Sequence, residues 1–362
     1  MKKSLLALAA LGLFAGAASA QSSVTLFGIV DAGVARLTAK TSAGSKSITG
    51  MTNSGLNSSR LGFRGVEDLG GGLRAGFHIE GQVFNDSGDG RGTGLPFDFQ
   101  RRSTVSLMGG FGEVRLGRDY TPTFSNVSAY DPFGTNGVGT SMATSMLFGL
   151  GIATGQSNTR QNNSIGYFLP GNLGGFTGNF QFGFAENVSG TRKANQYFGA
   201  RLGYAAGPLA VTAAYGDNTA AVKANDVQYM SIGASYDVGV VKPMGYFARE
   251  KADGGARIDA YLIGATVPLG QGELRASVAR YDLKKNAQGL NSRNDWDKYA
   301  IGYGYNLSKR TQLYGTYAVV RNKNGQVKTI GQNGLASPVV APATVLGGKN
   351  ATGLEAGIRH SF

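Results

Sequence analysis

Arginines recur at alternate positions along several stretches of this chain. Arg60 and Arg64 share one parity in "SRLGFRGVED", and Arg74 falls on the polar parity of "LRAGFHIEGQ". Side chains two residues apart in a strand point to the same side, so these arginines would gather on one face of a sheet. Such a surface, if concave, would concentrate anions and repel cations. The basic residues on this parity are Arg60, Arg64, Arg74, Arg102, Arg115 and Arg160, and the acidic ones are Asp31, Glu80 and Glu113.

Residues suited to catalysis are scarce. The chain has two histidines, His78 and His360, neither of them near a plausible nucleophilic serine, and it has no cysteine. The glycines of "GVEDLGGGLRAG" lack the following helix and the lysine of a phosphate-binding loop, so this stretch predicts a turn between strands. No His or Cys spacing suggests a metal site. We therefore expect a protein that is not an enzyme and that needs no cofactor or metal.

The elements that would carry the arginines are strands. Segments of about ten residues with alternating polarity occur almost everywhere, for example "FTGNFQFGF", "MSIGASY", "KYAIGYGYN" and "TQLYGTYA". A period of two indicates strands with one apolar and one polar face. Helical patterns are nearly absent after residue 20.

Turns of two kinds interleave between these strands. Longer polar loops, such as Asn85–Gly94 and Glu186–Asn195, separate seven short turns, which predict sixteen strands with both chain ends on the short-turn side. An insertion is expected between Gly110 and Pro170, where the spacing of short turns is widest. The short turns are Glu67–Gly72, Gly109–Gly112, Pro170–Gly175, Ala206–Pro208, Asp237–Gly239, Pro268–Gly272 and Asn306–Lys309.

The first residues, "MKKSLLALAALGLFAGAASA", have the form of a secretory signal peptide. We expect cleavage before Gln21, leaving residues 21–362 as a single barrel domain. Without the two lysines of residues 1–20, 33 basic and 22 acidic residues would give a formal charge of +11. Export argues against nucleic acid as a partner for this charge. It also makes the absence of disulfides notable, because continuous backbone hydrogen bonding must then hold the fold together.

Two architectures use many amphipathic strands. A soluble β-sandwich or propeller buries its apolar face, whereas a transmembrane barrel turns that face to lipid and its polar face to an aqueous lumen. One sixteen-stranded barrel accounts for the whole mature chain and for the asymmetry of its turns. It also explains why "GLEAGIRHSF" alternates to the last residue, since a final strand that closes a ring against "SSVTLFGIVDAG" cannot fray. Phe362 would then face the bilayer at the rim.

A set of motifs spread over residues 21–362 resembles the general porins of the Gram-negative outer membrane, in particular the β-proteobacterial trimeric type. These motifs are "SSVTLFGIVDAGV", "SRLGFRGVEDLGGGLRAGFHIE", "GRDYTP", "RQNNSIGY", "LSKRTQLYGTYA" and "GIRHSF". The resemblance implies an all-β, sixteen-stranded antiparallel transmembrane barrel that is multi-pass in the outer membrane and assembles as a homotrimer. It also implies that the third long loop, here Asp119–Thr159, folds inward and narrows the channel.

The same resemblance suggests roles for single residues. A pore constriction is expected from Arg60, Arg102 and Arg160 on the wall, with Asp119 and Asp131 of the loop on the opposing acidic side. The other polar-parity residues, Arg64, Arg74, Arg115, Glu80, Glu113 and Asp31, would line the pore. Phe362 occupies the position of the signal that the barrel-assembly machinery reads. Arg36 and Arg101 fall on the outward parity near the outer rim, where they would meet lipopolysaccharide phosphates.

These expectations converge on a water-filled channel for passive diffusion of small hydrophilic solutes and ions, with a preference for anions. Its partners would be outer-membrane lipid, lipopolysaccharide, and small anionic and polar solutes. Two other functions stay open at this point. One is an adhesive or structural barrel with a plugged lumen, and the other is a substrate-specific channel that uses the aromatic residues of the inserted loop.

Overall fold

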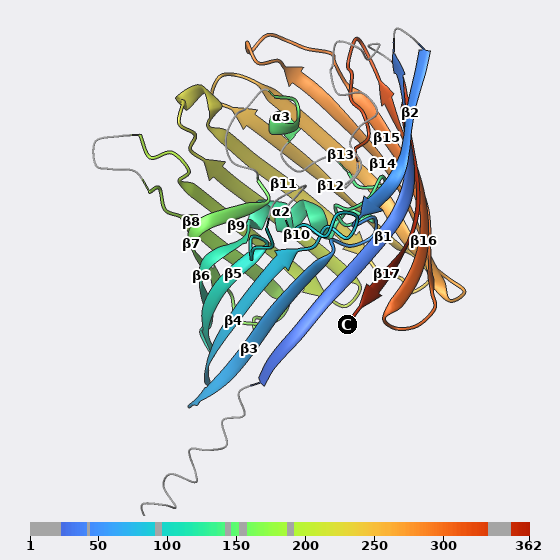
Figure 1. Ribbon diagram of the computed structural model, residues 1–362. Helices are drawn as coiled ribbons and strands as arrows, with labels where there is room; N and C mark the ends of the chain where they lie inside the picture. The colour runs from blue at the N-terminus through green and yellow to red at the C-terminus, as the bar shows by residue number, and fades with distance from the viewer. Residues whose placement is uncertain are drawn as a thin grey trace, which may run out of the picture.

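The computed structural model describes residues 23–41, 44–90, 96–141, 146–151, 158–186, 192–331 and 349–362. The predicted signal peptide lies outside the described residues. Antiparallel strands follow one another around a single sheet (Figure 1). The strands are β1 (Ser23–Thr41), β2 (Gly44–Asn53), β3 (Arg60–Gly70), β4 (Leu73–Gln82), β5 (Arg102–Gly109), β6 (Gly112–Tyr120), β7 (Arg160–Phe168), β8 (Phe176–Gly183), β9 (Tyr197–Ala206), β10 (Leu209–Asn218), β11 (Val227–Tyr236), β12 (Lys242–Ala252), β13 (Arg257–Leu269), β14 (Gly272–Lys285), β15 (Trp296–Asn306), β16 (Thr311–Asn322) and β17 (Ala351–Ser361).

The wall is sixteen strands around, although seventeen strands are assigned in the described residues. β2 and β3 both pair with β1, β2 along Ala32–Thr41 and β3 along Ser23–Ile29, so together they occupy one position in the wall. A short turn joins each of the pairs β3–β4, β5–β6, β7–β8, β9–β10, β11–β12, β13–β14 and β15–β16, at one end of the barrel. The predicted strand number and all seven predicted short turns are therefore confirmed.

The ring closes where the two ends of the chain meet. β1 pairs with β17 from Ile29 opposite Ser361 to Ala39 opposite Ala351. Beyond this ladder, the Gly28 N–H donates to the Phe362 carbonyl at 3.2 Å and the Phe362 N–H donates to the Gly28 carbonyl at 3.1 Å. A Cβ on Gly28 would lie 2.3 Å from Cζ of Phe362, so only glycine leaves room for that ring. Closure pairs the backbone of the first and last strands, as a hydrocarbon environment requires.

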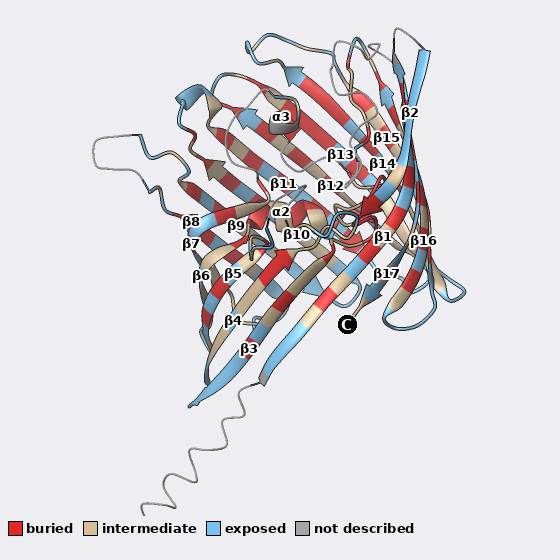
Figure 2. Ribbon diagram, viewed as in Figure 1, coloured by how far each residue is buried: buried red, intermediate tan, exposed pale blue. Residues whose placement is uncertain are grey.

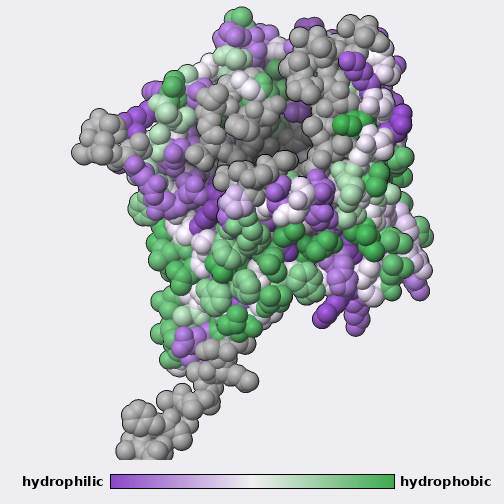
Figure 3. Space-filling model, viewed as in Figure 1, coloured by the Kyte–Doolittle hydropathy of each residue, from purple (hydrophilic) through white to green (hydrophobic). Residues whose placement is uncertain are grey.

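The two faces of the wall are inverted relative to those of a soluble protein. Large apolar side chains point outward and are exposed, among them Ile263 at 77%, Val24 at 65% and Phe176 at 62%. Polar side chains such as Thr212 and Ser231 point inward and are buried. Buried and exposed residues therefore alternate as bands along the strands (Figure 2). Apolar residues cover the side of the wall and hydrophilic ones gather along the long-loop rim (Figure 3), the pattern of a barrel in a bilayer.

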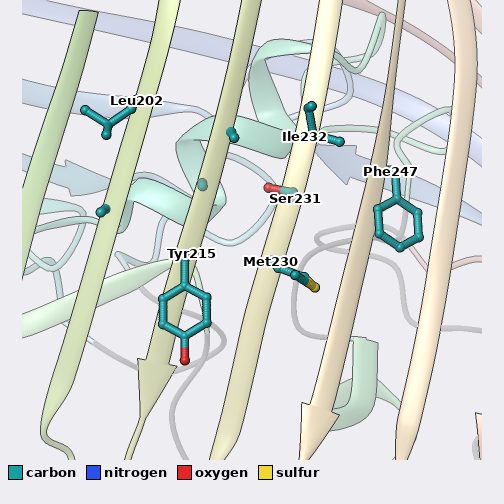
Figure 4. Close-up of a pocket in the computed structure, with 9 residues that line it drawn as sticks. Leu202, Tyr215, Met230, Ser231, Ile232 and Phe247 are labelled. Atoms are coloured by element: carbon teal, nitrogen blue, oxygen red, sulfur yellow. The ribbon is translucent and has the colours of Figure 1, made fainter.

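The outer wall also carries a shallow apolar hollow of about 470 Å³. Leu202, Tyr215, Met230, Ile232 and Phe247 line it from β9 to β12 (Figure 4). It contains none of the arginines of the polar parity, and its apolar lining continues the outward surface. We therefore assign it to the lipid-facing side of the molecule.

Between β6 and β7 the chain leaves the wall for the segment 121–159, which carries two short helices, α2 (Pro122–Ala129) and α3 (Met146–Gly149). The hydroxyl of Thr121 caps α2 by accepting the Phe124 N–H at 3.1 Å, and Pro122 begins the helix. Its polar side chains bond inward-facing residues of the wall: Asn126 donates to Ser231 at 2.8 Å. In Figure 1, α2 lies within the ring of strands. These helices were not expected from the sequence.

No helix among the described residues combines the length and the apolar character needed to cross a membrane.

Candidate functional site

A polar cavity of about 620 Å³ separates one part of the inner wall from residues 124–136 of the inserted segment. Three arginines line the wall side, and hydroxyl and amide side chains line the facing side. Among the described residues that line it there is no carboxylate. The wall contributes Arg60, Arg101, Arg160 and Tyr120, and the remaining polar lining includes Asn57, Ser58, Ser125, Ser128, Thr135 and Asn136.

A single buried carboxylate, Glu80 of β4, organises the cationic side of this cavity. Its Oε1 accepts from Nε of Arg101 at 2.5 Å and lies 3.6 Å from Nη1 of Arg60. Its Oε2 lies 3.4 Å from Nε2 of His78. One negative charge thus fixes two guanidinium groups. Because Glu80 neutralises only one of the two positive charges, the cluster of Glu80, Arg60 and Arg101 stays cationic. Glu80 was expected to line the pore, but it is 6% exposed and is not among the residues that line this cavity.

Tyr120, the last residue of β6, holds the third arginine. Its hydroxyl accepts from Nη2 of Arg160 at 2.8 Å and from Nη2 of Arg101 at 2.6 Å. The Arg160 guanidinium also lies 4.4 Å from the centre of the Tyr120 ring, and that ring stacks with Phe124 of α2 at 5.1 Å. Cation–π contact and hydrogen bonding together restrict the long Arg160 side chain.

The placement of Arg101 differs from the sequence expectation. Parity assigned it to the outer surface, but it is 4% exposed and bonded to Glu80 and Tyr120 on the inside. β5 begins at Arg102, so Arg101 precedes the strand and does not follow its alternation. Adjacent arginines can therefore both point inward at a strand entrance. Sequence reasoning missed Arg101 for this reason, and the Arg101–Arg102 doublet after a long loop was the available signal.

Arg102 belongs to a neighbouring group rather than to the cavity itself. Its Nε lies 3.7 Å from Oδ1 of Asp119 and donates to the Thr104 hydroxyl at 3.1 Å. Asp119 also pairs with Arg115, which lies 2.8 Å from Glu113. Asp119 thus sits on the wall beside the arginines, not across the lumen from them. Arg102, Arg115 and Glu113 border a second hollow of about 380 Å³ that Arg64 and His78 also line.

Asp131 does not reach the arginines. Its carboxylate is 5% exposed and accepts the N–H groups of Phe133 at 2.9 Å and Ser141 at 2.7 Å. These bonds shape the turn after α2 within the segment. Charge opposite Arg60 and Arg160 is therefore not supplied by Asp131, and the facing side is neutral among the described residues that line the cavity.

The remaining expected pore-lining residues divide into two kinds. Arg64 and Arg74 are exposed and lie on the inward parity of β3 and β4, and Arg64 lies 5.2 Å from the centre of the Phe27 ring. Phe27 also packs edge-on against His78 at 5.2 Å, which accounts for an apolar residue on the inner side of β1. Asp31 instead is 0% exposed, so the expectation that it lines the pore is wrong.

The described residues contain no group of three or more His, Asp or Glu side chains arranged to hold a metal ion.

Comparison with known proteins identifies relatives over the whole chain. A family model described as Gram-negative porin matches residues 7–325. Outer membrane porin protein 32 of Delftia acidovorans is 42% identical over 371 residues, with all of both chains covered. An outer membrane porin protein of Bordetella pertussis is 32% identical over 380 residues, with 88% of this chain and 94% of that protein covered.

Solved structures of porins have the same fold as this chain. The anion-selective porin from Comamonas acidovorans superposes with a TM-score of 0.80 at 39% identity, covering 94% of this chain and all of that one. A trimer form of OmpT from Vibrio cholerae has the same fold, with a TM-score of 0.62 at 16% identity, 94% of this chain and 99% of that one being covered. The barrel is closed, with an apolar exterior and a basic interior, and its porin relatives match it over its full length. This chain therefore belongs to the Gram-negative porin family and lies in the outer membrane.

Proposed function

We propose that this porin is a passive diffusion channel for small hydrophilic solutes and ions, with a preference for anions. The observation that carries the proposal is the cavity in which Arg60, Arg101 and Arg160 face hydroxyl and amide groups instead of carboxylates. Three guanidinium groups offset by one carboxylate leave a net positive potential, which raises the local concentration of anions and opposes cations. The Comamonas acidovorans relative, described as anion-selective, supports the same preference.

The constriction of this channel would lie between the wall arginines and the segment 121–159. The sequence predicted Arg60, Arg102 and Arg160 for it, and we keep Arg60 and Arg160, add Arg101, and give Arg102 a place in the adjacent hollow with Arg115 and Arg64. Asp119 would moderate that second group. Asp131 would act only through the shape of the segment.

Further proposals concern export and assembly. Residues 1–20 would be removed as a signal peptide, leaving 21–362 as the barrel. Phe362, half exposed at the rim and bonded to Gly28, has the position expected of a signal for the barrel-assembly machinery. A homotrimer is supported by the porin relatives, among them the trimer form of OmpT. Short turns would face the periplasm and long loops the exterior, where Arg36 would meet lipopolysaccharide.

The proposal is tested by recording currents from the purified protein in a planar bilayer. Under a potassium chloride gradient, discrete open steps and a reversal potential on the chloride side are expected. A folded, heat-modifiable oligomer without conductance would contradict the channel and favour an adhesive or structural barrel. A reversal potential on the potassium side would contradict the anion preference while leaving the channel intact.

A substrate-specific channel is a second candidate, because Arg160, Tyr120 and Phe124 form a stack of cation and aromatic rings beside the cavity. Such a stack can hold a planar anion. Conductance that saturates with one aromatic carboxylate, but not with acetate, would favour this function over general diffusion.

A further inference from the structure

We infer that three buried residues on the closing seam of the barrel, Asp31 of β1, Tyr314 of β16 and Glu355 of β17, set the shape of the pore cavity without lining it. Asp31 and Glu355 are 0% exposed and Tyr314 is 6% exposed, and none of them borders the cavity. We call them the seam network. The inference rests on the proposed channel function and concerns how its constriction is held.

The seam network first holds the stretch of chain that leaves the wall between β2 and β3. β2 ends at Asn53 and β3 begins at Arg60, and the residues between them, Ser54–Ser59, leave the ladder as an inner bulge. Oδ2 of Asp31 accepts the N–H groups of Leu56 at 2.7 Å and Asn57 at 2.6 Å. The Asp31 carbonyl accepts the Ser54 N–H at 2.9 Å. The carboxylate therefore replaces the strand partners that the bulge has lost.

Tyr314 reaches this carboxylate from two strands away. Its hydroxyl donates to Oδ1 of Asp31 at 2.7 Å, although β17 lies between β16 and β1. The ring crosses β17 over Gly357, where a Cβ would lie 2.4 Å from the Tyr314 hydroxyl, and Gly357 pairs with Gly33 of β1. The Tyr314 side chain can reach Asp31 across β17 only when β17 is paired with β1. The bulge is thus fixed by the closed state of the barrel.

Glu355 connects the bulge region to the inner segment. Its Oε1 accepts from the Thr52 hydroxyl at 2.9 Å, and its Oε2 accepts the Val138 N–H at 3.1 Å. The Ser58 hydroxyl donates to Oδ1 of Asn136 at 2.8 Å, so the bulge and the segment also touch directly. Gly137, at a φ of 69°, lies so close to the Gly55 carbonyl that a Cβ would be 2.1 Å away.

The parts held in this way are the ones that border the cavity. Asn57 and Ser58 of the bulge, and Thr135 and Asn136 of the segment, line it together with Arg60, the residue that follows the bulge. Loss of a buried carboxylate–donor bond leaves polar groups unsatisfied, so the bulge and the segment would shift toward the lumen or away from it. The seam network would thereby act as a set of positioning residues for pore width and for the direction of Arg60.

The test compares single-channel currents of the full-length mature protein and three variants, Asp31→Asn, Tyr314→Phe and Glu355→Gln. Each should change the single-channel conductance by at least about a quarter, raise the open-channel noise and shift the chloride-to-potassium permeability ratio. The matched control is Tyr303→Phe, which also removes one tyrosine hydroxyl, in this case bonded at 2.9 Å to the Leu269 carbonyl at a short turn. It should leave all three readouts unchanged.

Folding is checked separately by heat-modifiable migration of the oligomer. Tyr314→Phe removes a single hydroxyl and keeps the test decisive if Asp31→Asn does not fold. Folded Tyr314→Phe and Glu355→Gln channels with wild-type conductance, noise and permeability ratio would overturn the inference. A wild-type protein without conductance would instead remove the proposed channel function, so the two failures are distinguishable.

Discussion

The inner face of the barrel has two sides that differ in charge and in solvent exposure. One side, the arginine wall, consists of Arg101 and the inward residues of β3–β7, where Arg60 and Arg102 keep 25% and 21% of their side chains exposed. The other side, the covered wall, consists of the inward residues of β11–β16 beneath residues 130–141 and α3, where Tyr281 and Trp296 stack at 4.8 Å and are 0% and 1% exposed. The first side is partly exposed and cationic, and the second is apolar and buried like the core of a soluble protein.

This difference shows how a porin can carry an apolar segment in an aqueous lumen. Leu147 and Met146 of α3 are 0% and 3% exposed because they join the same apolar cluster as Tyr246 and Trp296. Burying one such side chain contributes about 1.5–3 kcal/mol. Through these residues the segment adheres to the covered wall, while Phe124 of α2 stacks on Tyr120 beside the arginines.

The largest expected effect comes from removing charge from the arginine wall. In the combined variant Arg60→Gln, Arg101→Gln and Arg160→Gln, we expect the chloride-to-potassium permeability ratio to fall about fivefold or more, because the local positive potential is lost. Reversal potentials in a salt gradient measure this ratio. Arg36→Gln, on the outer face, serves as the control and should leave it unchanged.

The same recordings sharpen the assignment within the arginine wall. Arg101→Gln is expected to reduce the ratio more than Arg102→Gln, because only Arg101 borders the cavity. An equal or larger effect of Arg102→Gln would instead support the constriction expected from the sequence, which consists of Arg60, Arg102 and Arg160.

On the covered wall, Leu147→Ala should weaken the attachment of the segment. We expect its local free energy of opening to fall by about 2–5 kcal/mol, the usual cost of such a truncation in a packed core. Limited proteolysis within the segment, followed by mass spectrometry, measures the effect. Leu202→Ala on the lipid face is the comparison, and equal cleavage of both variants would mean that α3 is not anchored by its apolar contacts.

Glu250→Gln tests the polar anchor of the same helix. The Glu250 carboxylate accepts the N–H groups of Met146 and Leu147, each at 2.8 Å. Replacing one charged acceptor oxygen with an amide donor should cost about 1.5–3 kcal/mol, because hydrogen bonds to charged groups are the stronger ones. Hydrogen exchange of these two amides measures the cost, and unchanged protection would contradict the anchor.

The smallest expected effect is a pH dependence from the loop residue Lys328. Burial lowers the pKa of its ammonium group, and the nearby Glu250 carboxylate opposes that shift in part. Because the folded state disfavours the charged form, stability should rise as the pH increases from the lowered pKa toward the ordinary lysine value of about 10.4, and the penalty should be complete below that range.

The check is urea unfolding of the detergent-solubilised barrel across this alkaline range. Lys328→Met should show a flatter stability profile than the wild type. Identical profiles would mean that Lys328 keeps an ordinary titration in the folded protein.

The architecture was readable from the sequence because alternation and turn composition are local properties. Seven short turns and a terminal strand that runs to Ser361, next to the last residue, follow from turn composition and from polarity with a period of two, and each is found in the structure. The outward position of residues such as Ile263 follows from the same rule.

The candidate site was less predictable, because parity holds only within an uninterrupted strand. Asn163, at a φ of 46°, marks an irregularity in β7, and the pairing of β6 with β7 shifts between Gly117 and Asp119. Arg101 lies just before its strand, so alternation does not apply to it. Asp31 was placed correctly on the inner parity, but a bulge twenty-three residues later in the chain covers it, which no local pattern reveals.

The meeting of Gly28 with Phe362 has a consequence for how the chain could be rewired. Ser23 lies five residues before Gly28, or about 17 Å along an extended strand. A linker of about six residues would therefore join the two ends, and new termini could be opened in a long loop. In such a circular permutant every strand would keep its neighbours, while the order in which strands emerge from the ribosome would change. In the closed ring no strand comes first; only the order of synthesis distinguishes a first strand from a last one.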